Sequence, residues 1–152
     1  MIAVSSVADF TQGTFQPVMG DAGINGTPLD AQSVKRVLLC SGKVYYDLYQ
    51  ARAERGITDT AIVRMEQIYP LPVDELKAVL ASYPNAEDFA WVQEEPANQG
   101  GWTFVALNLL EHLEGVRLRR ISRPAAAAPA VGSAKMHEAE QQALVEAALP
   151  RP

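Results

Sequence analysis

Polar side chains that could make specific contacts gather between Asp88 and Trp102 (DFAWVQEEPANQGGW). The stretch begins with Phe89 to Val92, an apolar run rich in strand-forming residues, and its closing glycine pair precedes an apolar pattern with helical spacing. Between them we expect an acidic, proline-containing turn that carries Glu94 and Glu95. In open α/β sheets, ligands and partners gather at the carboxyl ends of the strands. We therefore expect any specific contact of this chain at residues 93–99.

The two glutamates of this turn could suggest general acid–base chemistry. Adjacent residues of an extended chain point to opposite sides, so Glu94 and Glu95 cannot easily share a proton. A solvated or partner-facing acidic turn is the better interpretation. The residues that we predict to form an interface here are Glu94, Glu95, Asn98, Gln99 and Trp102.

Two other segments could hold an anion. Residues 41–43 (SGK) lie where a strand should turn into a helix, and backbone N–H groups in such a turn can bind phosphate. The longer glycine-rich phosphate loops are absent, which favours a plain tight turn. Arg117, Arg119, Arg120 and Arg123 form the one basic cluster. They could bind a phosphate-bearing effector or an acidic partner, or they could simply protect a charged edge strand.

No catalytic or metal-binding residue set is predicted. His112 and His137 have no partner one helical turn away, and Cys40 ends an apolar run as a small buried side chain would. Residues 20–23 (GDAG) faintly resemble the start of a thiamine diphosphate motif, but no Asn-Asn pair follows, so we interpret them as a loop. The residues alone therefore predict a binding or assembly domain.

Composition limits the class of protein. The 152 residues are 48% apolar and 20% charged, which suits one soluble domain, and the net charge of -5 argues against nucleic-acid binding. A single cysteine fits a reducing compartment. No apolar run approaches the roughly 20 residues of a membrane span, and residues 1–10 do not resemble a signal peptide. We expect a cytoplasmic protein that does not enter a membrane.

The elements that must position these residues follow an alternating pattern. We expect strands within 15–19, 37–40, 61–63, 89–92 and 116–121, and helices at 44–56, from 73, from 102 to near Gly115, and after Ser133. Four parallel strands with right-handed crossovers and a short edge strand make a three-layer α/β/α domain. We place an N-terminal extension at 1–35, the α/β domain at 36–149 and a tail at 150–152.

Four blocks of this sequence resemble one family. They are 37–48 (VLLCSGKVYYDL), 61–72 (AIVRMEQIYPLP), 91–100 (WVQEEPANQG) and 120–124 (RISRP), and residues 9–13, 131–132 and 140–142 also fit. The family is the C-terminal domain of the thiamine-dependent first component of 2-oxoglutarate dehydrogenase, with particular similarity to the actinobacterial multifunctional 2-oxoglutarate metabolism enzymes. The resemblance covers nearly the whole chain.

The resemblance implies a transketolase C-terminal-type fold, with a mixed five-stranded sheet in which one edge strand is antiparallel to four others. It also implies the reaction of the full enzyme, in which thiamine diphosphate and Mg²⁺ support decarboxylation of 2-oxoglutarate and the succinyl group passes to a lipoyl arm. In the family, that cofactor lies between two preceding domains across a homodimer interface. The resemblance therefore implies a fragment or separately encoded piece, with no cofactor and no activity of its own. Its implied partners are those domains and the lipoyl succinyltransferase component.

Mycobacterial-type relatives also imply an acetyl-CoA site. The site in those relatives uses a lysine and a serine near the first strand, a glutamine after the second strand and two arginines at the start of the next helix. At the corresponding positions this chain has Thr14, Pro17, Gln67, Asp74 and Glu75. Only Gln67 matches. Two carboxylates in place of two cations should repel a phosphate-rich ligand. An alternative hypothesis is a stand-alone regulator that binds nucleotides or CoA through residues 41–43 or the arginines. A truncated gene product without a role is a third.

Overall fold

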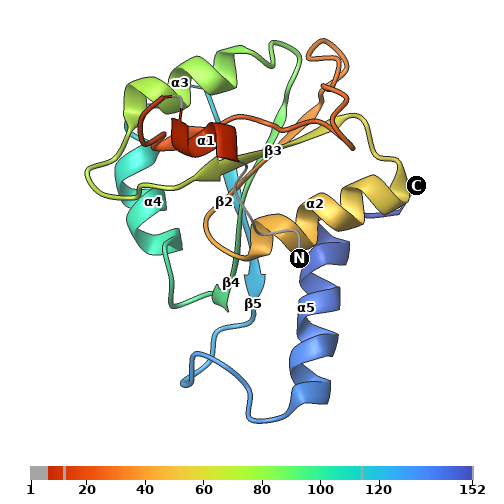
Figure 1. Ribbon diagram of the computed structural model, residues 1–152. Helices are drawn as coiled ribbons and strands as arrows, with labels where there is room; N and C mark the ends of the chain where they lie inside the picture. Colours follow the sequence, from red (N-terminus) through yellow and green to blue (C-terminus); the bar gives the residue numbers. More distant parts are fainter. Residues whose placement is uncertain (1–6, 12, 114, 152) are drawn as a thin grey trace.

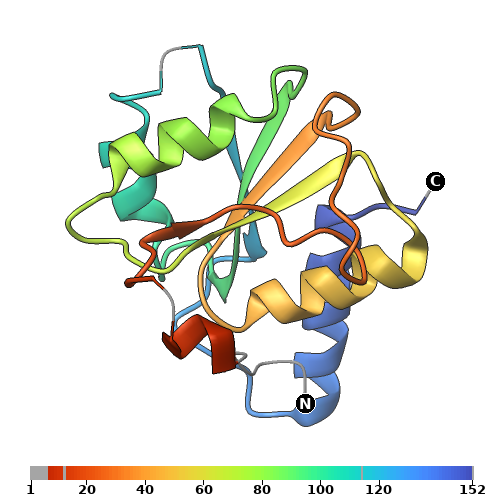
Figure 2. The same cartoon turned by 45° about the horizontal axis from the view of Figure 1, so that its top comes forward.

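The computed structural model describes residues 7–11, 13–113 and 115–151. It forms three layers, with a central sheet between two pairs of helices (Figure 1). One layer holds α3 (Val73–Ala81) and α4 (Trp102–Leu109), and the other holds α2 (Val44–Arg55) and α5 (Ala134–Ala148). Viewed with its top turned forward, the short helix α1 (Val7–Thr11) lies in front of the sheet, outside both layers (Figure 2).

The sheet contains β1 (Val18–Met19), β2 (Arg36–Cys40), β3 (Thr60–Met65), β4 (Asp88–Pro96) and β5 (Leu118–Arg123). Their spatial order is β1-β3-β2-β4-β5. The β1 strand pairs with β3 in antiparallel fashion, and the other neighbours are parallel. The mixed five-stranded sheet with one antiparallel edge strand confirms the predicted fold class.

Alternation along the strands divides the core into two halves. In β2, Val37 and Leu39 pack under α3 and α4, whereas Leu38 and Cys40 pack under α2 and α5. All four are fully buried, as expected for a central parallel strand covered on both faces. A strand that is covered on both faces needs an uninterrupted apolar sequence. This is why the apolar run at residues 37–40 correctly predicted β2.

The predicted turn at Glu94 and Glu95 is wrong in one respect. The β4 strand continues through both residues to Pro96, and the turn begins at Ala97. Beyond Val92, β4 has lost its neighbour β2, and its pairing with β5 shifts register before resuming at Pro96. A bulge of this kind redirects side chains at the margin of a sheet. Pro96 is suited to this position because proline has no backbone N–H that would need a partner in the neighbouring strand.

Three helix termini can be compared with the sequence predictions. The α2 helix ends as predicted at Gly56, which is left-handed with φ of 62°. The α4 helix ends at Leu109, well before Gly115, because the chain tightens there and the N–H of His112 bonds the carbonyl of Leu109, three residues back. Ser133 occupies the predicted N-cap position of α5, but its side chain makes no capping hydrogen bond.

A buried ion pair attaches the N-terminal segment to the sheet. Asp21 and Arg52 are in contact, and their side chains are 4% and 1% exposed. Asp21 also accepts the N–H of Ile62 at 2.6 Å and that of Gly23 at 2.7 Å. The carboxylate thus occupies the margin of β3 just beyond the end of β1. Among the described residues, no helix is long and apolar enough to cross a membrane.

Candidate functional site

One buried amide organises the turn that follows β4. Gln93 is 3% exposed, and its Oε1 accepts the indole N–H of Trp91 at 2.9 Å and the backbone N–H of Trp102 at 2.8 Å. Its Nε2 donates to the carbonyls of Gln99 at 2.7 Å and Pro96 at 3.1 Å. The strand, the turn and the start of α4 are therefore joined through a single side chain.

The glycine pair before α4 lets the backbone approach this amide. Gly100 has φ of +68°, and a Cβ atom there would lie 2.9 Å from the Cβ of Glu95 and 3.1 Å from Nε2 of Gln93. A Cβ at Gly101 would lie 3.1 Å from the Trp91 ring. Gly100 thus needs to be glycine for the turn to stay closed, and Gly101 lets the backbone pack tightly against Trp91.

The five predicted interface residues lie together at this carboxyl edge of the sheet, but they are not equally available. Glu94 forms an ion pair with Lys43 at 2.9 Å. The side-chain amides of Asn98 and Gln99 each donate to the carbonyl of Ala126 at 3.0 Å. Glu95 is exposed, and the half-buried ring of Trp102 lies 5.6 Å from the guanidinium of Arg120. Glu95 is thus the member with the least internal engagement, whereas Trp102 also packs against the core and keeps part of its ring exposed.

The SGK turn is an unfavourable place for an anion. Nζ of Lys43 lies 2.9 Å from Glu94 and 3.0 Å from Asp47, so two carboxylates surround one ammonium. The hydrogen bond to Glu94 raises the pKa of Lys43, with a smaller contribution in the same direction from Asp47. Its positive charge is already neutralised, which favours the tight-turn interpretation.

The structure does not bring the four arginines together. Arg119 pairs with Asp88 at 2.7 Å, and Arg120 lies on the opposite face of β5, over Trp102. Arg123 is buried against α5, where it lies 3.1 Å from Nδ1 of His137. A side chain on each face of an edge strand cannot converge on one phosphate.

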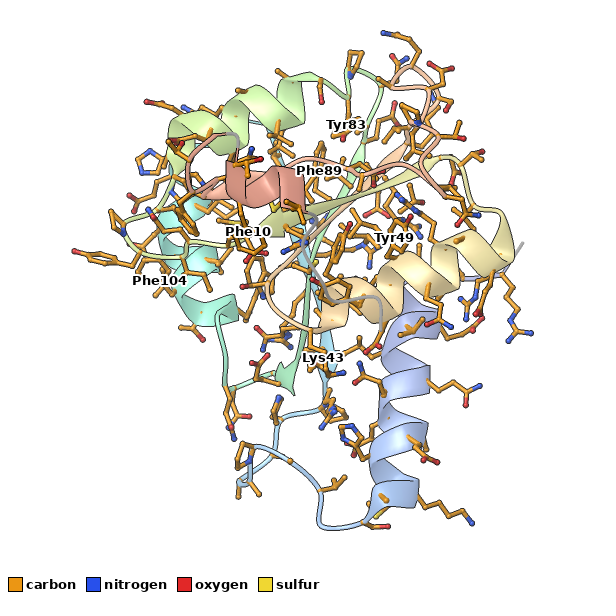
Figure 3. The ribbon with its side chains drawn as sticks, in the orientation of Figure 1. Phe10, Lys43, Tyr49, Tyr83, Phe89 and Phe104 are labelled. Carbon is orange, nitrogen blue, oxygen red and sulfur yellow. The ribbon has the colours of Figure 1, made fainter. Side chains whose placement is uncertain are left out.

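Sequence reasoning missed an apolar surface beside the turn, here called the α4 apolar face: Tyr69, Phe104, Leu107 and Leu110. Tyr69 is 80% exposed and Leu107 is 68% exposed. The ring centroids of Tyr69 and Phe104 lie 6.2 Å apart, and Figure 3 shows Phe104 on α4 at the margin of the molecule. The sequence did contain a signal for this surface, because the apolar residues of segment 102–110 are distributed around the whole helix rather than along one stripe.

Gln67, the one residue that matches the acetyl-CoA pattern, makes its side-chain hydrogen bond within its own loop. Its Nε2 donates to the carbonyl of Pro70 at 2.8 Å, within the loop that leads to α3. Asp74 and Glu75 are exposed in the first turn of α3. An incoming phosphate would meet these carboxylates before it reached the helix N terminus.

The remaining candidates for chemistry are inert in this structure. Burial raises the pKa of the Cys40 thiol to about 12, with Arg64 opposing and Glu66 adding to the shift. A thiol with such a pKa is not a nucleophile near neutral pH. His112 is exposed, and the described residues contain no group of three His, Cys, Asp or Glu side chains suited to a metal ion.

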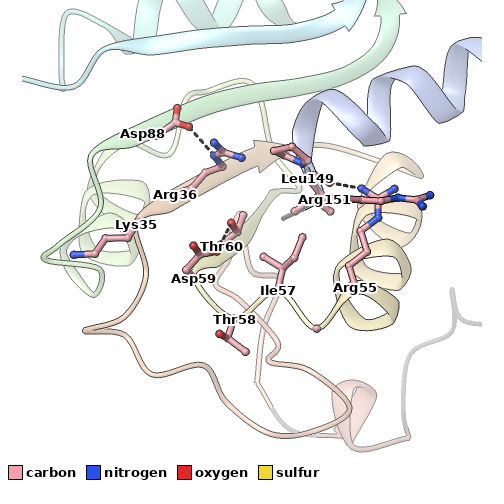
Figure 4. Close-up of a pocket in the computed structure, with 12 residues that line it drawn as sticks. Lys35, Arg36, Arg55, Ile57, Thr58, Asp59, Thr60, Asp88, Leu149 and Arg151 are labelled. Atoms are coloured by element: carbon pink, nitrogen blue, oxygen red, sulfur yellow. Dashed lines mark hydrogen bonds and ion pairs between the residues drawn. The ribbon is translucent and has the colours of Figure 1, made fainter.

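The opposite, amino-terminal edge of the sheet carries a polar hollow of about 490 Å³ (Figure 4). Arg36 there pairs with Asp88 at 2.6 Å and also donates to the carbonyl of Ala148. Arg55 bonds the carbonyl of Leu149 and pairs with Glu146 at 2.8 Å. These arginines donate to the last carbonyls of α5 and place positive charge at the negative end of the helix dipole, so they stabilise this helix end.

Comparison with known proteins identifies the family. A family model described as "2-oxoglutarate dehydrogenase C-terminal" matches residues 4–149. The chain belongs to this family. It is 47% identical over 147 residues to the 2-oxoglutarate dehydrogenase E1 component of Cupriavidus necator, an alignment that covers 96% of the chain and 15% of that protein.

Two further relatives are much longer proteins. The chain is 45% identical over 148 residues to the multifunctional 2-oxoglutarate metabolism enzyme of Mycolicibacterium vanbaalenii, covering 96% of the chain and 12% of that enzyme. It is 43% identical over 148 residues to the E1/E2 component of Corynebacterium glutamicum, again with 96% and 12% covered. The chain thus spans 12–15% of the length of these relatives and corresponds to the C-terminal domain of 2-oxoglutarate dehydrogenase E1.

The 20–23 loop, which faintly resembles the start of a thiamine diphosphate motif, does not fit the Mg²⁺ that accompanies this cofactor. Mg²⁺ needs free oxygen ligands, and the acidic residue of the 20–23 loop is Asp21. Both of its carboxylate oxygens are committed, one to Arg52 and Ile62 and the other to Gly23. No step of cofactor chemistry can be assigned to this loop.

Proposed function

We propose that this chain is the assembly domain of a 2-oxoglutarate dehydrogenase E1 and has no decarboxylase activity by itself. The carboxyl edge of its sheet packs against domains that bind thiamine diphosphate and Mg²⁺, and it strengthens their homodimer. The complete enzyme decarboxylates 2-oxoglutarate and passes the succinyl group to a lipoyl succinyltransferase component. The observation that carries this proposal is the α4 apolar face beside a rigid polar turn.

The two surfaces suit an interface for different reasons. The α4 apolar face exposes Tyr69 and Leu107, which a lone domain would be expected to cover. The neighbouring turn presents Glu95 and Trp102 on a backbone already fixed by Gln93. An apolar centre with a preorganised polar border is the usual anatomy of a stable interface. We therefore keep the five predicted turn residues as its border and add the α4 apolar face as its centre.

A stand-alone nucleotide- or CoA-binding regulator is the competing function. The neutralised Lys43 and the separated arginines both weigh against it. A thermal-shift screen with adenine nucleotides and CoA esters distinguishes the two functions, since a ligand that binds the folded chain raises its melting temperature. A clear shift with any of these ligands would favour the regulator.

The assembly role is tested by co-expressing the chain with the thiamine-binding domains of a relative and measuring co-purification and CO₂ release from 2-oxoglutarate. Leu107→Asp should weaken co-purification strongly, because it buries a charge in the apolar centre. Asn108→Asp adds the same charge to the next exposed position of α4 and should have little effect. Equal behaviour of the two variants, or no co-purification with soluble, folded partner domains, would refute the proposal.

A further inference from the structure

The sequence contains one asparagine that is followed by glycine, at Asn25-Gly26. The two residues form the tip of a tight turn, in which Ile24 and Thr27 exchange backbone hydrogen bonds of 2.8 and 2.9 Å. Asn25 has φ of 49° and Gly26 has φ of +81°, which are the left-handed conformations of a two-residue hairpin turn. Both residues are exposed, so water reaches the turn from outside.

Neither the side-chain amide of Asn25 nor the backbone N–H of Gly26 is engaged elsewhere. Among the described residues, neither group has a hydrogen-bond partner. Glycine has no Cβ to shield its nitrogen, and a Cβ built at Gly26 would meet no atom within 4 Å. The turn is closed only by an isolated bridge between Ile24 and Thr27, so little structure opposes rotation of the Asn25 side chain toward this nitrogen.

The other three asparagines are held by hydrogen bonds. The side-chain amide of Asn85 donates to the carbonyl of Gln32 at 2.9 Å, and that of Asn108 donates to the carbonyl four residues before it at 2.7 Å. Asn98 donates to the carbonyl of Ala126 and accepts its N–H, at 3.0 and 3.1 Å. The N–H groups that follow Asn85 and Asn98 are also bonded, to carbonyls at 3.1 and 2.9 Å. Only at position 25 are both groups free.

We propose that Asn25 is a site of spontaneous deamidation. The nitrogen of Gly26, after losing its proton to solvent, bonds to Cγ of Asn25. The bond from Cγ to Nδ2 breaks, and Nδ2 takes a proton from solvent and leaves as ammonia. Water then opens the succinimide at either of its two carbonyls. Opening at Cγ gives aspartate, whereas opening at the main-chain carbonyl gives isoaspartate, in which the backbone runs through the former side chain.

Isoaspartate matters at this position because the turn closes over the buried contact of Asp21 and Arg52. The carbonyl of Gly23 accepts Nη2 of Arg52 at 2.6 Å, and the N–H of Gly23 bonds Asp21 at 2.7 Å. Gly23 is packed so tightly that a Cβ on it would clash with the carbonyl oxygen of Thr27. Isoaspartate adds one backbone carbon to a two-residue turn, which then cannot keep its register. The product therefore loosens the segment that covers Arg52. This site does not depend on the assembly role.

Storage of the purified chain at mildly alkaline pH, followed by brief tryptic digestion and mass spectrometry, tests the proposal. Trypsin releases residues 1–35, with Asn25 as their only asparagine, and residues 78–117, with the other three. The mass gain from replacement of NH₂ by OH should appear at residue 25 in the first peptide and not in the second. It should appear faster as the pH is raised, and an isoaspartyl methyltransferase should label the product. A residue 25 that keeps its amide, or equal gains in both peptides, would overturn the proposal.

Two variants separate the backbone change from the change in charge. Stored wild-type chain that carries isoaspartate should melt at a lower temperature than fresh chain. Asn25→Asp has the added charge on an unaltered backbone, so when fresh it should melt close to the wild type. Asn25→Gly lacks the reacting amide and suits a left-handed position, so storage should leave its melting temperature unchanged. Isoaspartate-bearing chain that melts like fresh chain, or an equal loss in fresh Asn25→Asp, would contradict the loosening of this segment.

Discussion

At position 93 the amide of glutamine does what no charged side chain could do. Its oxygen accepts two N–H groups while its nitrogen donates to two backbone carbonyls, all within a buried turn. A carboxylate could not donate, and an ammonium could not accept. The sequence placed Gln93 in the right region, but only the structure shows that it holds the turn together from within.

A second residue-scale feature is the buried contact between Asp21 and Arg52. We expect Asp21→Asn to lower the free energy of unfolding by about 3 kcal/mol, because Arg52 would keep a buried charge without its counter-ion. Urea unfolding followed by circular dichroism measures this. The exposed pair of Lys43 and Glu94 is the control, and Lys43→Gln should cost less than about 1 kcal/mol. Similar losses in both variants would contradict the structural importance of the buried pair.

Asp88 gives the chain a predicted pH dependence. Its hydrogen bonds to Arg119, and then to Arg36, lower its pKa, although burial opposes this. A lowered folded-state pKa stabilises the fold above the unfolded-state value, and that stabilisation is lost as the pH falls through the folded-state pKa. Asp88→Asn should therefore cost about 1 kcal/mol near neutral pH, since the group is partly exposed.

The difference between Asp88→Asn and the wild type should shrink as the medium is made acidic and vanish below the folded-state pKa. Unfolding free energies at a series of pH values measure it. Asp30→Asn is the control, because Asp30 is exposed and its carboxylate accepts the backbone N–H of Gln32 at 3.0 Å. A difference for Asp88→Asn that stays constant through the acid range would show that the two arginines do not act through its charge.

Among the elements, the turn between β4 and α4 depends on close backbone approach. Gly100→Ala should lower the unfolding free energy by about 2–3 kcal/mol, since it adds a clash with Glu95 and Gln93 to the cost of a left-handed conformation. Gly26→Ala shares the positive φ but meets no atom within 4 Å, and it should cost only about 1 kcal/mol. Equal losses would mean that the turn can open without penalty.

The same elements show what the sequence could predict. Continuous apolar runs such as residues 37–40 predicted the central strands, because strands covered on both faces need them. The end of β4 at Pro96 was missed, because β4 continues beyond its neighbour β2 and its last pairing is with Arg123 of β5. The α4 apolar face was missed because an apolar helix looks the same whether the domain or a partner covers it. Local pattern predicts what an element is, and tertiary contacts decide where it ends.

For the whole molecule, we predict that acetyl-CoA does not bind. Asp74 and Glu75 stand exposed at the start of α3, where relatives of the mycobacterial type imply cations. Calorimetric titration with acetyl-CoA should give no measurable heat of binding. Asp74→Arg combined with Glu75→Arg should create weak binding that salt suppresses. Binding by the unmodified chain that is lost in Gln67→Ala would show that the carboxylates do not exclude the ligand.

The most direct test of the proposal that the chain alone is no decarboxylase is an assay on the purified 152-residue chain. The chain is incubated with 2-oxoglutarate, thiamine diphosphate and Mg²⁺, and released CO₂ is counted against a protein-free blank. We predict no release above the blank, because the committed oxygens of Asp21 leave this loop without a ligand for Mg²⁺ and because the function we propose for the chain is assembly. Sustained CO₂ release that scales with the concentration of the chain would contradict the account.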